Sequence, residues 1–256
     1  MSIIDSFHKN SKPMIDVSMC YSKKDVRFDV IIINFSYVIM DALIEDGLIE
    51  LVYEDAIKSV SCLYPIYRFK GTNIGIVKTT VGAPITSVLC IELHFNFSCD
   101  KILLFGSCGT LDKTIKENAL IVPTSAYRDE GVSYHYMPIS DYIEINNHLV
   151  VSNILDALNV SYVKGKTWTT DAFYRETKEE IELRKKEGCI VVEMEVSACQ
   201  AVAKFHNFEF YTFLYRGDNL DSKEWEKGSL SLISADERLK ILNVAFQIAN
   251  ELTKAK

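Results

Sequence analysis

The sequence predicts an α/β protein, a three-layer α/β/α sandwich around a mixed central β-sheet. Two observations lead to this prediction. The strand-like runs are solidly apolar rather than alternating, and helix-like segments lie between or after several of them. Continuous apolar strands belong in a sheet that is covered on both faces, and the alternation of strands with helices is typical of layered α/β folds.

The strand-like runs are rich in β-branched and aromatic residues, which favour extended chain. In order, they cover residues 30–33, 74–80, 101–105, 119–122, 189–192 and 208–215. The helix-like segments contain good helix formers, and the one after residue 195 is rich in alanine. In order, they cover residues 85–97, 148–158, 178–186, 195–205 and 236–254.

The length and composition are those of one globular unit. The chain has 256 residues and is 48% hydrophobic, with no linker, repeat or low-complexity tract. A chain of this size can bury one large core. We therefore expect a single domain over residues 1–256, in which the irregular residues 1–25 form an N-terminal arm.

The charge and the cysteines narrow the classes of partner. The net charge is −7, and the only basic block is the short run 184–186. This argues against a nucleic-acid surface, and no apolar run approaches the roughly 18 residues of a membrane span. Seven cysteines without a Cys-x-x-Cys pair, and no signal-peptide pattern, predict a cytoplasmic protein with reduced thiols. The histidines lack metal-ligand spacing, so we expect no metal site.

The most informative motif is Glu193-Met194-Glu195, which places two carboxylates in a run that otherwise resembles buried core. Acidic side chains are almost never fully buried without a partner. In extended chain the two glutamates share a face and Met194 lies on the other, a geometry that suits acceptors for neighbouring sugar hydroxyls. The alternative is a pair of ordinary first-turn acids, stabilised by the helix dipole by roughly 0.3–1 kcal/mol each.

A second motif, Gly106-Ser107-Cys108-Gly109, directly follows the strand 101–105. The glycines allow close approach to an anion, and the backbone amides of such a turn can cradle an oxyanion. The alternative is a plain tight turn.

Asp218 ends a strand that is apolar and aromatic. A carboxyl group beside an apolar wall has a raised pKa and can act as a general acid. The alternative is that Asp218 caps a turn together with Asn219.

The segment 165–174 is polar yet unusually aromatic for a surface loop. Its rings could stack on a nucleobase, which contributes roughly 1–3 kcal/mol per base. Trp168 is the first choice for that role, and Phe173 and Tyr174 are second. The alternative is that Trp168 packs at the edge of the core. In the polar cluster 128–136, His135 is either a ligand contact or a structural residue.

These motifs together resemble a known family. Glu193-Met194-Glu195 before a small-residue helix is similar to the ribose-binding signature of the nucleoside phosphorylase and uridine phosphorylase family, whose relatives include nucleosidases. The Gly-Ser-Cys-Gly motif resembles the phosphate-binding loop of that family, and the likeness covers roughly residues 29–213.

The resemblance implies an enzyme that cleaves the N-glycosidic bond of a nucleoside with phosphate, giving free base and ribose 1-phosphate. Glu195 and Glu193 would bind the ribose, and Met194 would shape the sugar site. Trp168 or Phe173 would contact the base. Asp218, as general acid, favours purines. Ser107, Gly106 and Gly109 would position phosphate, which is the only co-substrate expected; no cofactor is implied.

The phosphate arginines of the family are the main departure. Leu104, Val38 and Val60 stand where arginines are expected, although Arg68 lies close enough in sequence to Val60 to substitute. Phosphate could then be held by Ser107, the loop amides and a relocated Arg27 or Arg68. Each charge-assisted hydrogen bond contributes roughly 1.5–3 kcal/mol, so their loss could change the reaction. Hydrolysis by water, or a binding protein without turnover, therefore remain alternatives.

The resemblance also implies a homo-oligomer with the site near a subunit contact. The polar segment 218–225 carries one large apolar residue, Trp225. It is either a loop that covers the site or a plain surface loop.

Overall fold

The computed structural model describes residues 2–59, 62–117, 119–228 and 234–254. Its strands are β1 (Val30–Asn34), β2 (Ile49–Lys58), β3 (Leu63–Phe69), β4 (Ile74–Lys78), β5 (Lys101–Thr110), β6 (Leu120–Asp129), β7 (Tyr142–Glu144), β8 (Tyr162–Thr170), β9 (Cys189–Glu193) and β10 (Glu209–Asn219). The α-helices are α1 (Val17–Cys20), α2 (Tyr37–Glu45), α3 (Ala83–Phe97), α4 (Ser133–Tyr136), α5 (His148–Ala157), α6 (Lys178–Lys186), α7 (Val196–His206) and α8 (Ala235–Lys254). Two 3-10 turns, η1 (Ile3–Asp5) and η2 (Phe173–Arg175), complete the elements.

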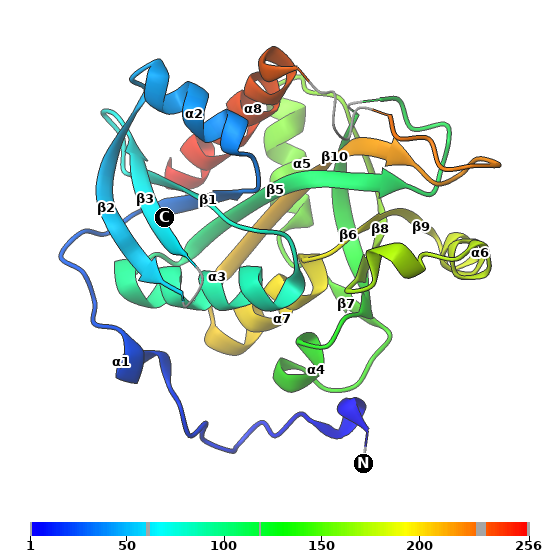
Figure 1. The fold of residues 1–256 in the computed structure, drawn as a ribbon, viewed down its shortest axis with the longest axis horizontal. Helices are drawn as coiled ribbons and strands as arrows, with labels where there is room; N and C mark the ends of the chain where they lie inside the picture. The colour runs from blue at the N-terminus through cyan, green and yellow to red at the C-terminus, as the bar shows by residue number, and fades with distance from the viewer. Residues whose placement is uncertain (1, 60–61, 118, 229–233, 255–256) are drawn as a thin grey trace.

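One mixed sheet forms the middle layer, as Figure 1 shows. Its strand order is β10-β6-β8-β9-β5-β1-β4-β3-β2, and β10 also pairs with β5. This last pairing closes the strands β5, β9, β8, β6 and β10 into a ring, from which the remaining strands extend as an open sheet. The ring brings β5, β9 and β10 together, although they are far apart in the sequence.

Helices cover both faces of the sheet (Figure 1). On one face, α2, α5 and α8 enclose a core cluster that includes Ile39, Leu155 and Ile248. On the other face, α3 and α7 enclose a second cluster that includes Leu93 and Val202. Because β1 is buried along its whole length, its run of aliphatic residues faces both clusters. The three-layer α/β/α prediction is therefore confirmed.

The sequence prediction missed the strands β2, β3, β7 and β8 and the helix α2. In β2 and β3, exposed and buried positions are mixed along the strand, so neither has the continuous apolar pattern of a central strand. The first half of β8 carries lysines, and only its residues 167–170 are fully buried. A half-polar strand at this place was indistinguishable from a loop.

The Gly106–Gly109 motif is also placed differently from the prediction. It is not a turn after a strand, because β5 continues as a strand to Thr110. Parallel pairing with β10 holds it extended, with Gly106 opposite Leu214 and Gly109 opposite Asp218. On the other edge of β5, the pairing with β1 ends at Leu104 and the pairing with β9 begins only at Gly109. Residues 105–108 therefore have one strand edge without a strand partner.

The N-terminal residues 2–25 run outside the layers, with only η1 and α1 as short helical turns, whereas Phe28 is buried in the core against Phe97 (Figure 1). Among the described residues, no helix is both long and apolar enough to cross a membrane.

Candidate active site

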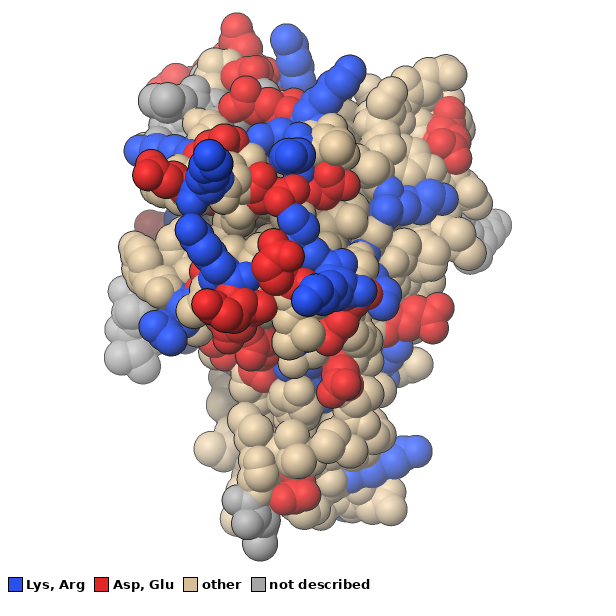
Figure 2. Space-filling model, turned by 90° about the vertical axis from the view of Figure 1, so that its right-hand side faces the viewer, with Lys and Arg blue, Asp and Glu red and all other residues tan. Residues whose placement is uncertain are grey.

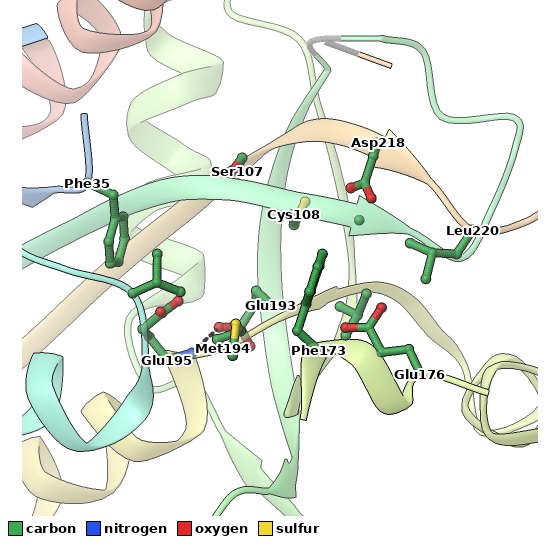
Figure 3. Close-up of a pocket in the computed structure, with 13 residues that line it drawn as sticks. Phe35, Ser107, Cys108, Phe173, Glu176, Glu193, Met194, Glu195, Asp218 and Leu220 are labelled. Atoms are coloured by element: carbon green, nitrogen blue, oxygen red, sulfur yellow. Dashed lines mark hydrogen bonds between the residues drawn. The ribbon is translucent and has the colours of Figure 1, made fainter. Parts of the chain in front are cut away.

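A cavity of about 290 Å³ opens where β5, β9 and β10 meet. Its size lies at the lower end of the range for small-molecule sites, roughly 300–1,000 Å³. The residues that line it are Phe35, Val81, Ser107, Cys108, Gly109, Phe173, Glu176, Val192, Glu193, Met194, Glu195, Asp218 and Leu220. Figure 3 shows Phe35 and Glu195 at one end and Phe173, Glu176 and Leu220 at the other. Four of the lining side chains are acidic, and no described lysine or arginine is among them.

The free edge of β5 forms one wall. Phe35, which follows β1, packs its ring against Gly106, and a Cβ atom on Gly106 would lie 2.9 Å from that ring. Real Cβ atoms do not approach so closely, so a side chain at this position would require the Phe35 ring to shift. The motif thus admits the Phe35 ring, and Ser107 beside it is exposed toward the cavity.

Glu193 is the most completely bonded acid of the cavity. One carboxylate oxygen accepts hydrogen bonds from the Thr167 hydroxyl at 3.2 Å and from the Thr169 hydroxyl. The other accepts from the backbone N–H groups of Glu195 at 2.7 Å and Val196 at 2.8 Å. These two amides belong to the first turn of α7, where N–H groups lack helical partners. Glu193 therefore caps α7 and ties it to β8, so its carboxylate is occupied and is not a free acceptor for ribose.

Glu195 is buried but keeps acceptor capacity. Its carboxylate accepts a hydrogen bond from the backbone N–H of Gly82 at 2.6 Å. Gly82 has φ +121°, a conformation that favours glycine. Burial raises the pKa of Glu195, and the nearby Glu193 carboxylate raises it further. Met194 lies beside it on the cavity wall, so the expected separation of Met194 from the two glutamates does not occur, because the chain turns into α7 after Glu193.

Asp218 is presented by an irregularity in β10. The pairing register with β5 shifts between Arg216 and Asp218, and such bulges re-aim side chains next to active sites. The carboxylate accepts a hydrogen bond from the indole N–H of Trp225 at 2.6 Å. Burial raises the pKa of Asp218, while the Trp225 hydrogen bond and the charge of Arg216 oppose that shift.

Glu176 is a lining residue that the sequence analysis did not identify. It follows η2 and sits next to Phe173 on the cavity wall. Burial raises the pKa of Glu176 to about 8, and the Asp218 carboxylate adds to the shift. The available signal was an acid two residues after the aromatic pair Phe173 and Tyr174, just beyond the segment 165–174 that was chosen for base contact.

The aromatic residues of that segment separate in the structure. Phe173 lines the cavity and is 40% exposed. Trp168 does not line it: the side chain is 2% exposed, packs in a core cluster with Ile181 and Val192, and donates its indole N–H to Asp129 at 2.9 Å. The expected order of the two rings is therefore reversed, because β8 extends to Thr170 and directs Trp168 into the core.

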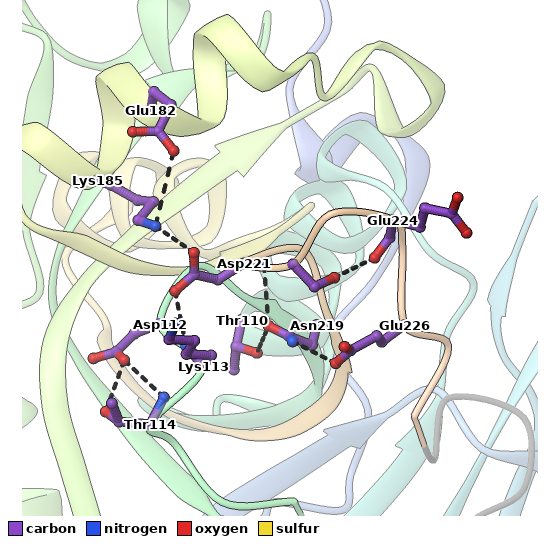
Figure 4. Close-up of polar contacts among 11 residues, drawn as sticks. Thr110, Asp112, Lys113, Thr114, Glu182, Lys185, Asn219, Asp221, Glu224 and Glu226 are labelled. Carbon is purple, nitrogen blue, oxygen red and sulfur yellow. Dashed lines mark hydrogen bonds and ion pairs between the residues drawn. The ribbon is translucent and has the colours of Figure 1, made fainter.

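The segment after β10 is tied down over the cavity. Figure 4 shows Asp221 accepting from the backbone N–H of Lys113 at 3.1 Å and from the ammonium group of Lys185. The Asn219 side-chain amide donates to Glu226 at 2.6 Å. These bonds fix a short turn whose Leu220 lines the cavity and whose Trp225 reaches Asp218. Of the two alternatives for the segment 218–225, a loop that covers the site and a plain surface loop, these contacts favour the first.

The expected replacements for the phosphate arginines lie elsewhere. Arg68 on β3 lies over the Phe28 ring and 3.9 Å from Glu50, away from the cavity of its own chain. Arg27 is exposed before β1. Leu104 and Val38 lie in β5 and α2, and Val60 falls outside the described residues.

A different arginine lies near the β5 edge. Arg238 on α8 donates to the Ser36 hydroxyl at 3.1 Å, and Ser36 directly follows the lining residue Phe35. Burial raises the pKa of Tyr215, and both Arg238 and the Ser107 hydroxyl oppose that shift. Tyr215, which pairs with Ser107 in the sheet, therefore lies within the electrostatic influence of Arg238.

The remaining polar cluster is not part of this cavity. His135 lines a separate hollow formed with the N-terminal residues. Arg128 is buried and donates to Ser133, Ser140 and nearby carbonyl groups. Arg128 thus stabilises the 128–142 segment, and His135 does not line the candidate site.

Comparison with known proteins agrees with this fold. The model of the Phosphorylase superfamily matches residues 42–247. A purine nucleoside phosphorylase of the DeoD type from Aliivibrio fischeri is 27% identical over 192 residues, which cover 72% of this chain and 77% of the relative. Because the family model matches most of the chain, the protein belongs to the Phosphorylase superfamily, whose members include nucleoside phosphorylases and nucleosidases.

Solved structures show the same fold. The purine nucleoside phosphorylase of Toxoplasma gondii in complex with immucillin-H superposes with a TM-score of 0.73 at 18% identity, covering 91% of this chain and 94% of that one. A futalosine hydrolase mutant of Helicobacter pylori superposes with a TM-score of 0.68 at 16% identity, covering 88% and 99%. One fold thus serves both a phosphorylase and a hydrolase.

The role of Glu193 as a cap gives a stability prediction. Glu193→Ala leaves two hydroxyl groups and two amides without their acceptor, so we expect a loss of about 3–5 kcal/mol in the free energy of unfolding. Urea denaturation measures this. The exposed Glu179→Ala is the matched control and should change stability by less than about 0.5 kcal/mol. Equal stabilities for the two variants would contradict the capping role.

Proposed function

We propose that this protein is a purine nucleoside phosphorylase-like enzyme, which cleaves the N-glycosidic bond with phosphate. The observation that carries the proposal is one cavity with a buried carboxylate at one end, Glu195, and an aromatic ring beside a protonatable acid at the other, Phe173 and Asp218. A nucleoside needs both ends, because its sugar offers hydroxyl groups and its base offers a flat ring with nitrogen acceptors.

The base end supplies the leaving-group chemistry. Phe173 would stack on the purine, and Asp218 would donate its proton to N7 as the electrons of the N-glycosidic bond move onto the base. The raised pKa of Asp218 favours the protonated form that this step requires. The base then leaves neutral rather than as an anion.

The sugar end would stabilise the ribosyl cation that develops as the bond breaks. Glu195, held by the Gly82 N–H group, would accept hydrogen bonds from ribose hydroxyls. Burial favours the protonated form of Glu195, but hydrogen bonds from ribose hydroxyls and the developing ribosyl cation would favour the ionised form. Its negative charge would then act strongly on the cation, because the site largely excludes water. Met194 would pack on the sugar, and Glu193 would act by fixing the start of α7.

Phosphate would bind along the free edge of β5 and attack C1′ of the ribose. Ser107 and the backbone of residues 105–108 would donate hydrogen bonds, and Arg238 would supply the positive charge. This assigns to a residue of α8 the charge expected from Arg68. Because Arg238 already lies at Ser36, next to Phe35, it needs only a side-chain movement to reach an anion at Ser107.

Hydrolysis is the second candidate function. The acidic lining of the cavity favours it, since four carboxyl groups disfavour a phosphate dianion and no described lysine or arginine lines the wall. The futalosine hydrolase with the same fold adds to this alternative. In that case water would replace phosphate at the β5 edge, and the roles of Asp218 and Glu195 would be unchanged.

Product analysis separates the two reactions. The pure protein is incubated with adenosine, inosine and uridine, each with and without phosphate, and base and sugar products are separated by chromatography. We expect purine release that requires phosphate and yields ribose 1-phosphate. Free ribose in phosphate-free buffer would establish hydrolysis, and no release at high protein concentration would refute both.

Replacement of the general acid tests the base end. Asp218→Asn can still donate a hydrogen bond but cannot transfer a proton, so we expect kcat/KM for purine nucleosides to fall about 10²- to 10⁴-fold. Asp141→Asn, at an exposed position, is the control and should retain activity. Full turnover by Asp218→Asn would remove the proposed acid.

Replacement of Arg238 tests the phosphate end. Loss of one charge-assisted hydrogen-bonding group costs roughly 1.5–3 kcal/mol, so Arg238→Ala should raise the KM for phosphate about 10- to 100-fold. The KM for the nucleoside should change much less. Lys240→Ala, also on α8 and exposed, is the matched control. An unchanged KM for phosphate in Arg238→Ala would show that this arginine does not bind the anion.

A further inference from the structure

Glu176 stands out among the acids of the cavity by its hydrogen bonding. Within the described residues Glu193 accepts four hydrogen bonds, Glu195 accepts one from the Gly82 N–H group, and Asp218 accepts one from the Trp225 indole. No hydrogen bond or ion pair from the described residues engages the Glu176 carboxyl, although burial is the largest influence on its pKa. A half-buried carboxyl without a protein partner at a cavity wall is available to a ligand.

The position of Glu176 assigns it to the base end. Figure 3 shows its carboxyl beside the Phe173 ring and below Asp218 and Leu220, on the side of the cavity opposite Phe35 and Glu195. A purine stacked on Phe173 with its N7 at Asp218 presents its six-membered ring beyond the five-membered ring, away from the sugar. Among the described polar side chains that line the cavity, Glu176 is the one placed to contact this edge of the six-membered ring, because Asp218 is assigned to N7 and Glu195 to the sugar.

The charges around Glu176 favour its neutral form. The groups that act on it are Asp218 from β10 and Glu180 from α6, and both are acidic. With burial they raise its pKa to about 8, so the group is mostly protonated at pH 7. A neutral carboxyl carries one donor and one acceptor side by side.

We propose that Glu176 is a specificity-determining residue, whose neutral carboxyl hydrogen-bonds the six-membered ring of the purine at N1 and at the 6-substituent. The proposal rests on the proposed nucleoside cleavage and adds the substrate class. Adenine offers an acceptor at N1 and a donor at its 6-amino group, and hypoxanthine offers the reverse pair. Both match a neutral carboxyl, whereas unsubstituted purine lacks the second group.

The test compares kcat/KM for adenosine and purine riboside in wild type, Glu176→Gln and Glu176→Leu. The amide of glutamine keeps one donor and one acceptor, so Glu176→Gln should stay within about threefold of wild type at pH 7. Glu176→Leu should lose about 10- to 100-fold with adenosine and much less with purine riboside, because two hydrogen bonds are lost with the first substrate. Glu179→Leu, exposed on α6, is the matched control.

The pH dependence gives a second readout. The Glu176 contribution should be present below pH 8 and lost as the pH rises through the pKa of about 8, because the carboxylate no longer donates. Glu176→Gln does not titrate, so its kcat/KM relative to wild type should rise above pH 8. The titration of Asp218 affects both proteins and largely cancels in this ratio.

Two results would overturn the proposal. An unchanged preference for adenosine over purine riboside in Glu176→Leu would show that Glu176 does not contact this edge. A loss in Glu176→Gln as large as in Glu176→Leu would show that the ionised carboxylate acts instead. If wild type cleaves no nucleoside, the proposed cleavage is refuted, and calorimetric titration with adenine and purine still tests the base contact. Weaker binding of adenine to Glu176→Leu than to wild type would support the contact. Equal binding of adenine to the two proteins would refute it.

Discussion

The hydrogen bonding of Glu193 is the constraint on which the site depends. A carboxylate in a run of buried residues is costly unless donors surround it, and here two threonine hydroxyls of β8 and two amides of α7 supply them. These bonds join a strand to the helix that follows the next strand. They fix the direction in which α7 leaves β9, and thereby the place where Glu195 and Met194 face the cavity. Glu195 then reaches the N–H group of Gly82, which precedes α3.

The other acids of the cavity differ from Glu193 in how far the protein satisfies them. Glu195 and Asp218 keep capacity for a ligand, and Glu176 has no hydrogen-bonding partner among the described residues. Burial raises the pKa of all four carboxyl groups, but the hydrogen bonds that oppose this shift differ from one group to the next. The raised pKa values therefore do not imply equal roles. Burial and partners together divide them into a structural cap, a sugar acceptor, a proton donor and a base contact in the proposed function.

The anion end shows how a fold can be kept while charges are rearranged. The free edge of β5 depends only on where β1 and β9 stop pairing with it, and not on the side chains nearby. With Leu104 buried in the core and Arg68 on β3, the cation that reaches Ser36, beside this edge, comes from α8, which packs against β1 and α2. Backbone geometry and charge are thus separable features of this site.

The sequence by itself determined the layered fold, since β-branched runs such as 30–33 must be covered on both faces. It also identified Glu195, Ser107 and Asp218 as candidate site residues, because a polar group in an apolar run is costly to bury without a partner or a ligand. It did not determine β8, or that Gly106–Gly109 is strand, because those depend on pairing with strands distant in the sequence. The tertiary structure alone decided that Trp168 is core and Phe173 lines the cavity, and that Glu193 is a cap. It also brought Glu176 and Arg238 to the site, since contacts between remote segments arise only when the sheet closes.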